Sequence, residues 1–243
     1  MKEWFEDWFD SPYYHLLYQH RNDEEAFAFV ERLIQWLNPL PDATLLDLAC
    51  GKGRHARAFS LHQLDVTGLD LSPQSIEHAK QFESDRLHFY VHDMRNVFRT
   101  NYYMYICNLF TSFGYFKTAH DNVLAARSMS QGLKPSGKLV VDFVNQSHAR
   151  KNIDASREET ILRDQVRFDI ERNYTDTQLL KKISIQDGDT NLCYTERVNS
   201  FTLQAMRSFF EQTGLQLLEV FGNYTLEAYD EQHSPRMILV FTK

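Results

Sequence analysis

Residues 45–56 read LLDLACGKGRHA, a short apolar run that reaches an aspartate and continues into a loop with two glycines. Gly51 and Gly53 lack a β-carbon, so the backbone at both positions can approach a ligand closely. A helix is expected to begin after Gly53, and the unpaired N–H groups of its N-terminus attract an anionic group such as a carboxylate. The stretch therefore predicts a strand, a ligand-binding loop and a helix, in that order.

The segments on both sides of this loop continue the alternation of strand and helix. An amphipathic helix is predicted over residues 22–37, with Asn22 as its cap and Glu25 as the partner of that cap. Further strands are predicted at 44–48, 65–69, 87–91, 103–109 and 138–144, and further helices at 54–62, 72–79 and 118–133. Strands that alternate with helices favour a parallel sheet with right-handed crossovers.

The pattern changes after Asn145, where alternating apolar residues and the turn signal Asp187-Gly188 predict antiparallel strands. A helix at 202–213 and strands at 215–221 and 236–241 then predict a long hairpin that closes the sheet. We therefore divide the chain into an N-terminal helical cap (1–41), a main domain (42–148 and 201–243) and an inserted antiparallel subdomain (149–200).

Two more acidic residues follow predicted strands. Asp70 lies seventeen residues after Gly53, and its two carboxylate oxygens can accept hydrogen bonds from both hydroxyls of a ribose. Asp93 follows the next strand and can accept a hydrogen bond from an adenine amino group, with Met94 beside the ring. These residues point to a ligand that contains an adenosine.

The order Asp47, Gly51, Gly53, Asp70, Asp93 resembles the class I S-adenosylmethionine-dependent methyltransferases of the small-molecule type, from about residue 42 to the end of the chain. The resemblance implies an α/β, Rossmann-like, seven-stranded and mostly parallel sheet with an antiparallel closing strand. It also implies helices on both faces and a small antiparallel β insertion after the fifth strand. The implied cofactor is S-adenosyl-L-methionine, the implied product is S-adenosyl-L-homocysteine, and no metal is implied.

The same resemblance assigns the cofactor site. The two glycines would line the methionine part, Asp47 would orient its amino group, Asp70 would hold the ribose, and Asp93 with Met94 would hold the adenine. The full implied set is Asp47, Ala49, Cys50, Gly51, Gly53, Asp70, Leu71, Asp93, Met94, Asn108 and Leu109. Ala49 departs from the pattern, because many relatives have the first glycine of the loop there.

Candidates for the acceptor side are less sharply defined. The catalytic candidates are Tyr115 and His148, the latter because an unperturbed imidazole titrates near neutrality. The candidates for substrate contact are Tyr13, Tyr14, Ser112 and Arg236. Arg236 either binds a substrate carboxylate or forms a surface salt bridge, and a solvated loop position is the alternative for His148. The insertion is either a lid over the pocket or a dimer surface, so both a monomer and a homodimer are open.

Charge and composition narrow the partners. The net charge of −7, without a dense Lys/Arg stretch, argues against nucleic acid and leaves a small-molecule acceptor. The acidic and aromatic N-terminus and the lack of about 18 consecutive apolar residues argue against a signal peptide and a membrane span. Three widely spaced cysteines suggest reduced thiols, so we expect a cytoplasmic protein.

Two other functions fit part of the pattern. Gly51, Gly53 and Ala56 match G-x-G-x-x-G/A, the fingerprint of NAD-dependent oxidoreductases, but Asp47 lies four residues before Gly51 and Asp93 has no place in that pattern. A regulatory module that binds S-adenosylmethionine without turnover is the second alternative.

Overall fold

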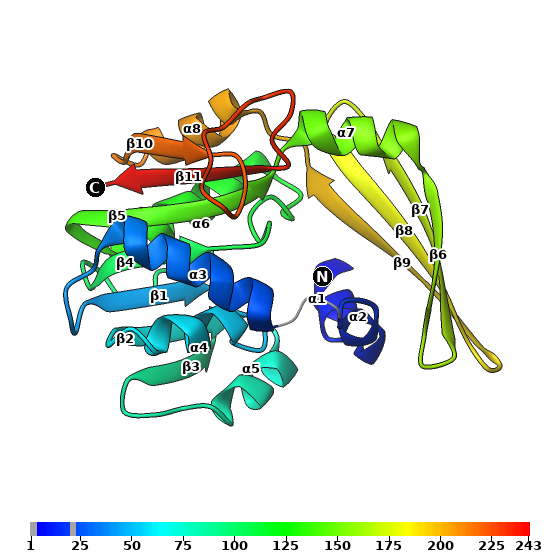
Figure 1. Cartoon of the computed structure of the whole chain (residues 1–243), viewed down its shortest axis with the longest axis horizontal. Helices are drawn as coiled ribbons and strands as arrows, with labels where there is room; N and C mark the ends of the chain where they lie inside the picture. Colours follow the sequence, from blue (N-terminus) through cyan, green and yellow to red (C-terminus); the bar gives the residue numbers. More distant parts are fainter. Residues whose placement is uncertain (1–3, 20–22) are drawn as a thin grey trace.

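A seven-stranded sheet forms the centre of the larger part of the molecule in the computed structural model, which describes residues 4–19 and 23–243 (Figure 1). Its strand order is β10-β11-β5-β4-β1-β2-β3. The strands are β1 (Thr44–Leu48), β2 (Asp65–Asp70), β3 (Leu87–Val91), β4 (Tyr103–Asn108), β5 (Leu133–Val144), β10 (Gln216–Phe221) and β11 (Arg236–Thr242). Strand β11 runs antiparallel to both neighbours, and the other pairs are parallel. This confirms the predicted fold class.

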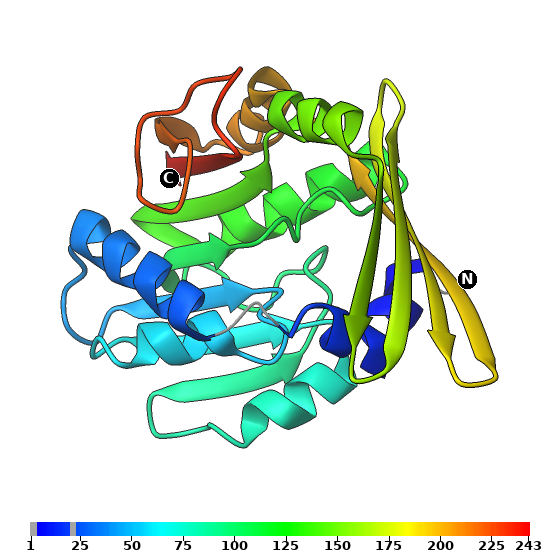
Figure 2. The same ribbon diagram turned by 45° about the vertical axis from the view of Figure 1, so that its right-hand side comes forward.

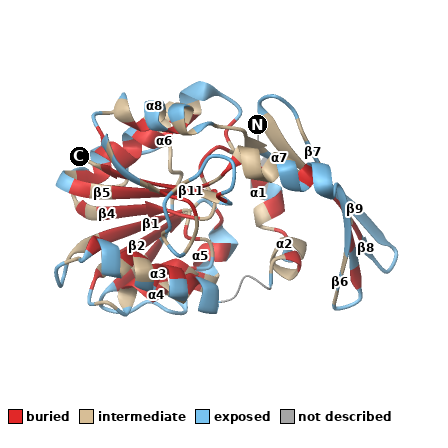
Figure 3. Cartoon of the chain, turned by 45° about the horizontal axis from the view of Figure 1, so that its top comes forward, coloured by how far each residue is buried: buried red, intermediate tan, exposed pale blue. Residues whose placement is uncertain are grey.

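Helices cover both faces of this sheet and form two apolar clusters with it. Helices α3 (Asp23–Leu37), α4 (Arg54–Ser60) and α5 (Pro73–Lys80) contribute to one cluster. Helices α6 (Ala119–Gly132) and α8 (Leu203–Glu211) contribute to the other. Strand side chains alternate between the two, as a pleated sheet requires. The central strands are accordingly buried along most of their length (Figure 3).

Most predicted elements lie within two residues of the observed ones. The Ser72 hydroxyl caps α5 by accepting the Ser75 N–H, as the Ser-Pro pair predicts. Strand β5 begins at Leu133, earlier than the predicted residue 138, because Leu133 already pairs with Tyr103 of β4. An irregular stretch with Ser136 at φ 63° follows, and the pairing resumes at Lys138. The expected cap Asn22 lies outside the described residues.

A second, antiparallel sheet stands beside the main body (Figures 1 and 2). Helix α7 (Gln146–Ala155) leads from β5 into its strands β6 (Glu158–Arg163), β7 (Val166–Tyr174), β8 (Gln178–Asp187) and β9 (Thr190–Asn199). Asp187 pairs with Thr190 across the two-residue turn that the Asp-Gly signal predicts.

The N-terminal helices α1 (Trp4–Phe9) and α2 (Pro12–Leu17) lie between the main body and the second sheet (Figure 2). Trp8 is 0% exposed and packs with Leu17 against the apolar face of the second sheet. Helix α3, in contrast, belongs to the core of the main body. The domain boundaries drawn from the sequence stay a prediction. Among residues 4–19 and 23–243, no helix combines the length and apolar character needed to cross a membrane.

We expect Gly68→Ala to lower the free energy of unfolding by about 1–3 kcal/mol, because it overpacks the core. A β-carbon at Gly68 in β2 would lie 2.4 Å from Phe89 Cδ1 and 3.0 Å from Cys50 Sγ. Urea denaturation measures the change. Phe89→Leu should cost less in the Gly68→Ala background than in the wild type, and purely additive effects would contradict this account.

Candidate functional site

A cavity of about 1230 Å³ opens between the main body, the N-terminal helices and the second sheet. Its floor is the carboxyl edge of the parallel strands, where open α/β sheets bind their ligands. Of the residues predicted from the sequence, those that line it are Ala49, Cys50, Gly51, Asp70, Leu71, Asp93, Met94, Leu109, Ser112, Tyr14, Tyr115 and Arg236. The structure therefore brings most of the predicted site together.

The glycine loop after β1 is held in left-handed backbone conformations. Gly51 has φ 55° and Gly53 has φ 83°, and Ala49 adopts φ 63° although it carries a β-carbon. A β-carbon built on Gly51 meets nothing within 4 Å, so this glycine borders open space. At Gly53 the same atom would lie 2.7 Å from Phe89, so this glycine is required by packing rather than by the cavity. Gly53 indeed lies outside the cavity lining.

Asp70 connects the loop after β1 to the end of β2. Its Oδ2 accepts the Gly51 N–H at 2.8 Å, and its Oδ1 accepts the Ser72 N–H at 2.9 Å. A carboxylate has about four acceptor positions, so each oxygen keeps capacity for a further donor from a ligand. Burial raises the pKa of Asp70. The Ser72 hydroxyl also bonds Asp10, which joins the N-terminal segment to this corner of the site.

Asp47 lies beneath the loop instead of on the cavity surface. It is 1% exposed, and its carboxylate accepts the Ala56 N–H, while Oδ2 has no hydrogen-bond partner among the described residues. Burial raises the pKa of Asp47 to about 7, and the nearby charge of Asp70 adds to the rise. A buried carboxylate with an unsatisfied oxygen is costly unless a donor or a cation arrives. This side chain is therefore suited to a ligand ammonium group, reached directly or through water.

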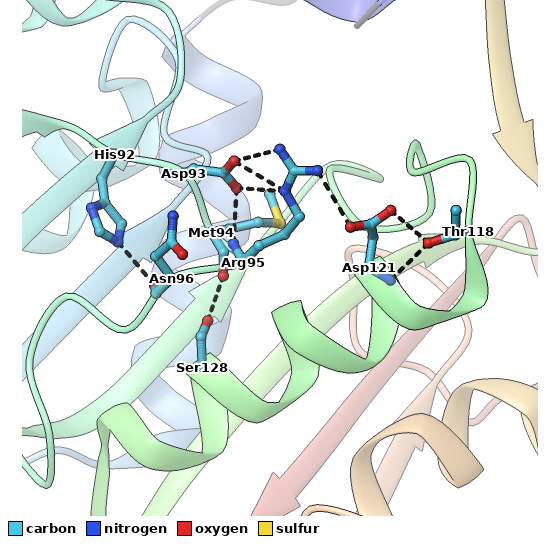
Figure 4. Close-up of polar contacts among 8 residues, drawn as sticks. All are labelled: His92, Asp93, Met94, Arg95, Asn96, Thr118, Asp121 and Ser128. Atoms are coloured by element: carbon cyan, nitrogen blue, oxygen red, sulfur yellow. Dashed lines mark hydrogen bonds and ion pairs between the residues drawn. The ribbon is translucent and has the colours of Figure 1, made fainter. Parts of the chain in front are cut away.

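Asp93 is held by its neighbour Arg95 (Figure 4). Arg95 Nη2 donates to Asp93 Oδ2 at 2.6 Å, Arg95 Nε contacts both oxygens, and Arg95 Nη1 reaches Asp121 at 3.4 Å. Burial acts to raise the pKa of Asp93, but the hydrogen bonds and charge of Arg95 outweigh it and lower the pKa. Asp93 is thus an ionised and fixed acceptor beside Met94, although Arg95 already occupies much of its capacity.

The loop after β4 rests on a buried ion pair. Phe110 and Thr111 adopt φ 64° and 59°. Asp142 at the end of β5 accepts the Phe110 N–H at 2.8 Å, and its other oxygen accepts Arg236 Nε at 2.7 Å. Arg236 also donates to the Thr111 hydroxyl, and Tyr224 donates to Asp142. Arg236 thus forms the salt bridge that was the alternative to a substrate carboxylate, but the bridge is buried instead of on the surface, because Asp142 is fully buried.

Besides Asp47 and Gly53, three further predicted residues are absent from the cavity lining. Asn108 is 0% exposed, and its amide donates to Leu48 O between β1 and β4. The Tyr13 hydroxyl donates to Asp187 on the β8–β9 turn, and His148 on α7 is absent from the cavity lining. Four histidines that the sequence did not indicate line the cavity: His15, His55, His78 and His92. Burial lowers the pKa of His15 to about 4, so its imidazole is neutral at pH 7.

The cavity thiol Cys50 is a packing residue and not a nucleophile. Burial raises the pKa of Cys50 far above its usual range, and the same holds for the buried Cys107. A thiol that stays protonated is a poor nucleophile.

The second sheet contributes residues that the sequence did not single out. Glu159, Arg172, Lys181 and Glu196 line the far side of the cavity. The sequence did contain a signal for them: side chains alternate between the two faces of a strand, and each of these residues falls on the face that the apolar residues occupy. Tyr18, at the C-terminal cap of α2, reaches the same region: its hydroxyl donates to Glu196 at 2.8 Å and accepts from Lys181 at 2.6 Å.

The groups around the glycine loop fit S-adenosylmethionine. The unsatisfied Asp47 oxygen suits an ammonium, the open space at Gly51 suits a close backbone approach, and Asp70 has acceptor positions left for ribose hydroxyls.

A model of the methyltransferase domain family matches residues 18–220 of the chain. Among curated proteins, the chain is 34% identical over 103 residues to a dTDP-3-amino-3,4,6-trideoxy-alpha-D-glucopyranose N,N-dimethyltransferase of Streptomyces venezuelae. That alignment covers 42% of this chain and 43% of the relative, so the chain spans less than half the length of that protein.

Solved structures share the fold over nearly the whole chain. An S-adenosylmethionine-dependent methyltransferase from Clostridium acetobutylicum superposes with a TM-score of 0.79 at 17% identity, over 95% of both chains. CalS10, an amino pentose methyltransferase from Micromonospora echinaspora solved with S-adenosylmethionine bound, gives a TM-score of 0.69 at 20% identity and covers 96% of this chain and 97% of its own. At these identities the likeness concerns the fold.

We expect Asp47→Asn to change how the free energy of unfolding depends on pH. The folded-state pKa of Asp47 is about 7, whereas an unfolded chain has about 4, so the folded state binds the extra proton between these values. Wild-type stability from this group is fully present below about pH 4 and falls by about 4 kcal/mol as the pH rises to 7. The unfolding free energy of the variant minus that of the wild type should therefore increase from pH 4 to pH 8 in urea titrations.

Asp93→Asn is the matched control, with the opposite sign. The pKa of Asp93 is lowered, so its contribution is present above the unfolded pKa and is lost as the pH falls through the folded pKa. Relative to the wild type, Asp93→Asn should therefore lower the free energy of unfolding most near pH 7 and progressively less at acidic pH. An Asp47→Asn difference that stays the same across this pH range would contradict a raised pKa at Asp47.

Ala49→Gly should stabilise the protein, because it removes a β-carbon from a left-handed backbone position. We expect a gain of about 1 kcal/mol, which corresponds to a rise in Tm of about 2–4 °C. The same substitution at Ala28, on the exposed side of helix α3, should instead lower stability by about 1 kcal/mol. If both variants melt below the wild type, Ala49 is not strained.

Proposed function

The chain belongs to the methyltransferase domain family of class I S-adenosylmethionine-dependent enzymes, and we propose that it transfers the methyl group of S-adenosylmethionine to an amino group of a small polar molecule. The observation that carries the proposal is the meeting of Asp47, Asp70 and Asp93 around the glycine loop at one edge of the sheet. The cavity there continues toward polar residues of the second sheet, which leaves room for an acceptor.

The chain's own groups bind and orient the cofactor. The backbone at Gly51 faces the methionine part, Asp47 attracts its ammonium, and Asp70 accepts from the ribose hydroxyls. Asp93 and Met94 form the adenine end, where Arg95 keeps the Asp93 carboxylate ionised. When bound, the sulfonium supplies an activated methyl group, whose transfer to an amine nitrogen yields a methylated amine, a proton and S-adenosylhomocysteine.

An aromatic wall excludes water from the region between the two ligands. Tyr115 contacts Phe9 at 5.3 Å, Phe9 contacts Tyr14 at 5.0 Å, and Tyr14 contacts Tyr18 at 4.9 Å between ring centroids. Aromatic faces attract cations, which suits both a sulfonium and an acceptor amine. With the reactive group supplied by the cofactor, positioning accounts for most of the catalysis.

The comparisons support nitrogen as the acceptor atom and a sugar-like acceptor, because one relative is named as an amino-sugar N,N-dimethyltransferase and one structural neighbour as an amino pentose methyltransferase. The net charge of −7 supports a small molecule over a nucleic acid. The cavity-lining face of the second sheet favours the role of a lid over that of a dimer surface.

Calorimetric titration with S-adenosylhomocysteine tests the cofactor half of the proposal. We expect a micromolar or tighter Kd, weakened about tenfold or more by Asp70→Asn, because each ribose hydrogen bond to a charged acceptor is worth about 1.5–3 kcal/mol. Asp65→Asn is the matched control, since Asp65 begins the same strand at the end away from the cavity.

Absence of S-adenosylhomocysteine binding, or binding of NADH in its place, would overturn the proposal. Turnover is measured as S-adenosylhomocysteine formed from S-adenosylmethionine with glucosamine, and with glucose as the amine-free comparison. Formation with both sugars alike would overturn nitrogen as the acceptor atom. Cofactor binding without turnover over a broad set of amines would indicate a silent regulatory module.

A further inference from the structure

Three charged residues lie side by side on the inner face of the second sheet. Arg172 on β7 pairs directly with Lys181 on β8, and Lys181 pairs directly with Glu196 on β9. Residues that face each other across antiparallel strands point to the same side of the sheet. We call Arg172, Lys181 and Glu196 the charged row, and all three line the cavity.

On this face of the second sheet, apolar side chains lie on both sides of the charged row. The next inward position along the three strands holds Ile170, Ile183 and Tyr194, which pack with Trp8 and Leu17 of the N-terminal helices. The inward position on the other side of the row holds Leu179 and Val198. Ionisable side chains on such a face are costly to desolvate unless they are paired or serve a ligand. Stability alone would favour apolar residues at these three positions.

The charges of the row find partners of opposite charge among residues 4–19 and 23–243. Arg172 forms an ion pair with Glu159 of β6. Lys181 Nζ donates to the Tyr18 hydroxyl at 2.6 Å, and that hydroxyl donates to Glu196 Oε1 at 2.8 Å. In the described part of the chain two cations therefore meet two carboxylates, so a ligand does not need a net charge to complete the site.

Hydrogen-bonding capacity nevertheless remains at both ends of the row. Glu196 Oε1 accepts from Trp8 Nε1 at 2.7 Å and from Tyr18, whereas Oε2 accepts no hydrogen bond from the described residues. At the other end, Arg172 uses Nη2 for Glu159, and within the described chain its Nε and Nη1 make no hydrogen bond. Arg172 and Glu196 both line the cavity, and their backbones lie about 10 Å apart across two strand spacings.

We propose that the charged row binds the hydroxyl groups of an uncharged, polyhydroxylated ring that carries the methylated amine. A hydroxyl both donates and accepts, so one ring hydroxyl donates to Glu196 Oε2 while another accepts from Arg172. This recognition explains why both a hydrogen-bond acceptor and hydrogen-bond donors stay unused in a site whose charges are balanced. The inference rests on the proposed function, because it names what selects the acceptor of that methyl transfer.

Glu196→Gln separates ligand binding from the docking of the N-terminal helices. Glutamine keeps a carbonyl oxygen for Trp8 and Tyr18 and replaces the open acceptor Oε2 by an NH₂ donor. The matched control is Glu171→Gln, since Glu171 is the β7 neighbour of Arg172 and points to the outer, solvent-exposed face. Melting temperatures of both variants check that the fold is retained.

The experiment is calorimetric titration of the full chain, saturated with S-adenosylhomocysteine, with cyclohexylamine, glucosamine and glucosamine 6-phosphate. We expect glucosamine to bind about tenfold or more tightly than cyclohexylamine, and Glu196→Gln to remove that advantage. The variant should leave the Kd values of cyclohexylamine and S-adenosylhomocysteine unchanged, and Glu171→Gln should change none of the three.

Equal binding of glucosamine and cyclohexylamine to the wild type, or no glucosamine binding, would overturn the proposal. An equal loss of both probes in Glu196→Gln would also overturn it, by assigning Glu196 a purely structural role. Tighter binding of glucosamine 6-phosphate than of glucosamine would assign the row to an anionic acceptor and contradict its neutrality. Failure of S-adenosylhomocysteine to bind would instead overturn the function on which the inference rests.

Discussion

The hydrogen bond that the Gly51 N–H donates to Asp70 Oδ2 joins the two strand ends on which the rest of the site depends. Strands β1 and β2 are parallel neighbours in register, so the loops that follow them emerge at one edge. A left-handed backbone at Gly51 turns its N–H toward the carboxylate, and a helix can then begin at Arg54. Loss of this contact would separate the glycine loop from Asp70.

A side chain at the end of one strand also holds the loop after β4, here through a buried ion pair. Strand β11 lies antiparallel beside β5, and this register places Arg236 next to Val144 and within reach of Asp142. The buried ion pair holds Phe110 and Thr111 in unfavourable conformations, at a cost of about 1–3 kcal/mol each. Strain at a ligand loop is tolerated here because the closing strand anchors it.

The N-terminal helices connect this rigid edge to the second sheet. Asp10 bonds Ser72 beside the glycine loop, while Trp8 and Tyr18 bond Glu196 on β9. One short segment therefore contacts both the corner beside the glycine loop and the second sheet. Trp8 and Leu17 of this segment pack on the apolar face of the second sheet, which gives an otherwise thin sheet a core of its own.

Local sequence determined the main fold and the residues that we propose for the cofactor, because strand periodicity, the glycine loop and strand-end acids such as Asp70 are all read within short stretches. Tertiary structure decided what depends on partners distant along the chain. It buried Arg236 against Asp142, turned Tyr13 away to Asp187, and aligned the charged row through register between three strands. Burial and register arise from long-range packing, and a single sequence does not specify which distant partners meet.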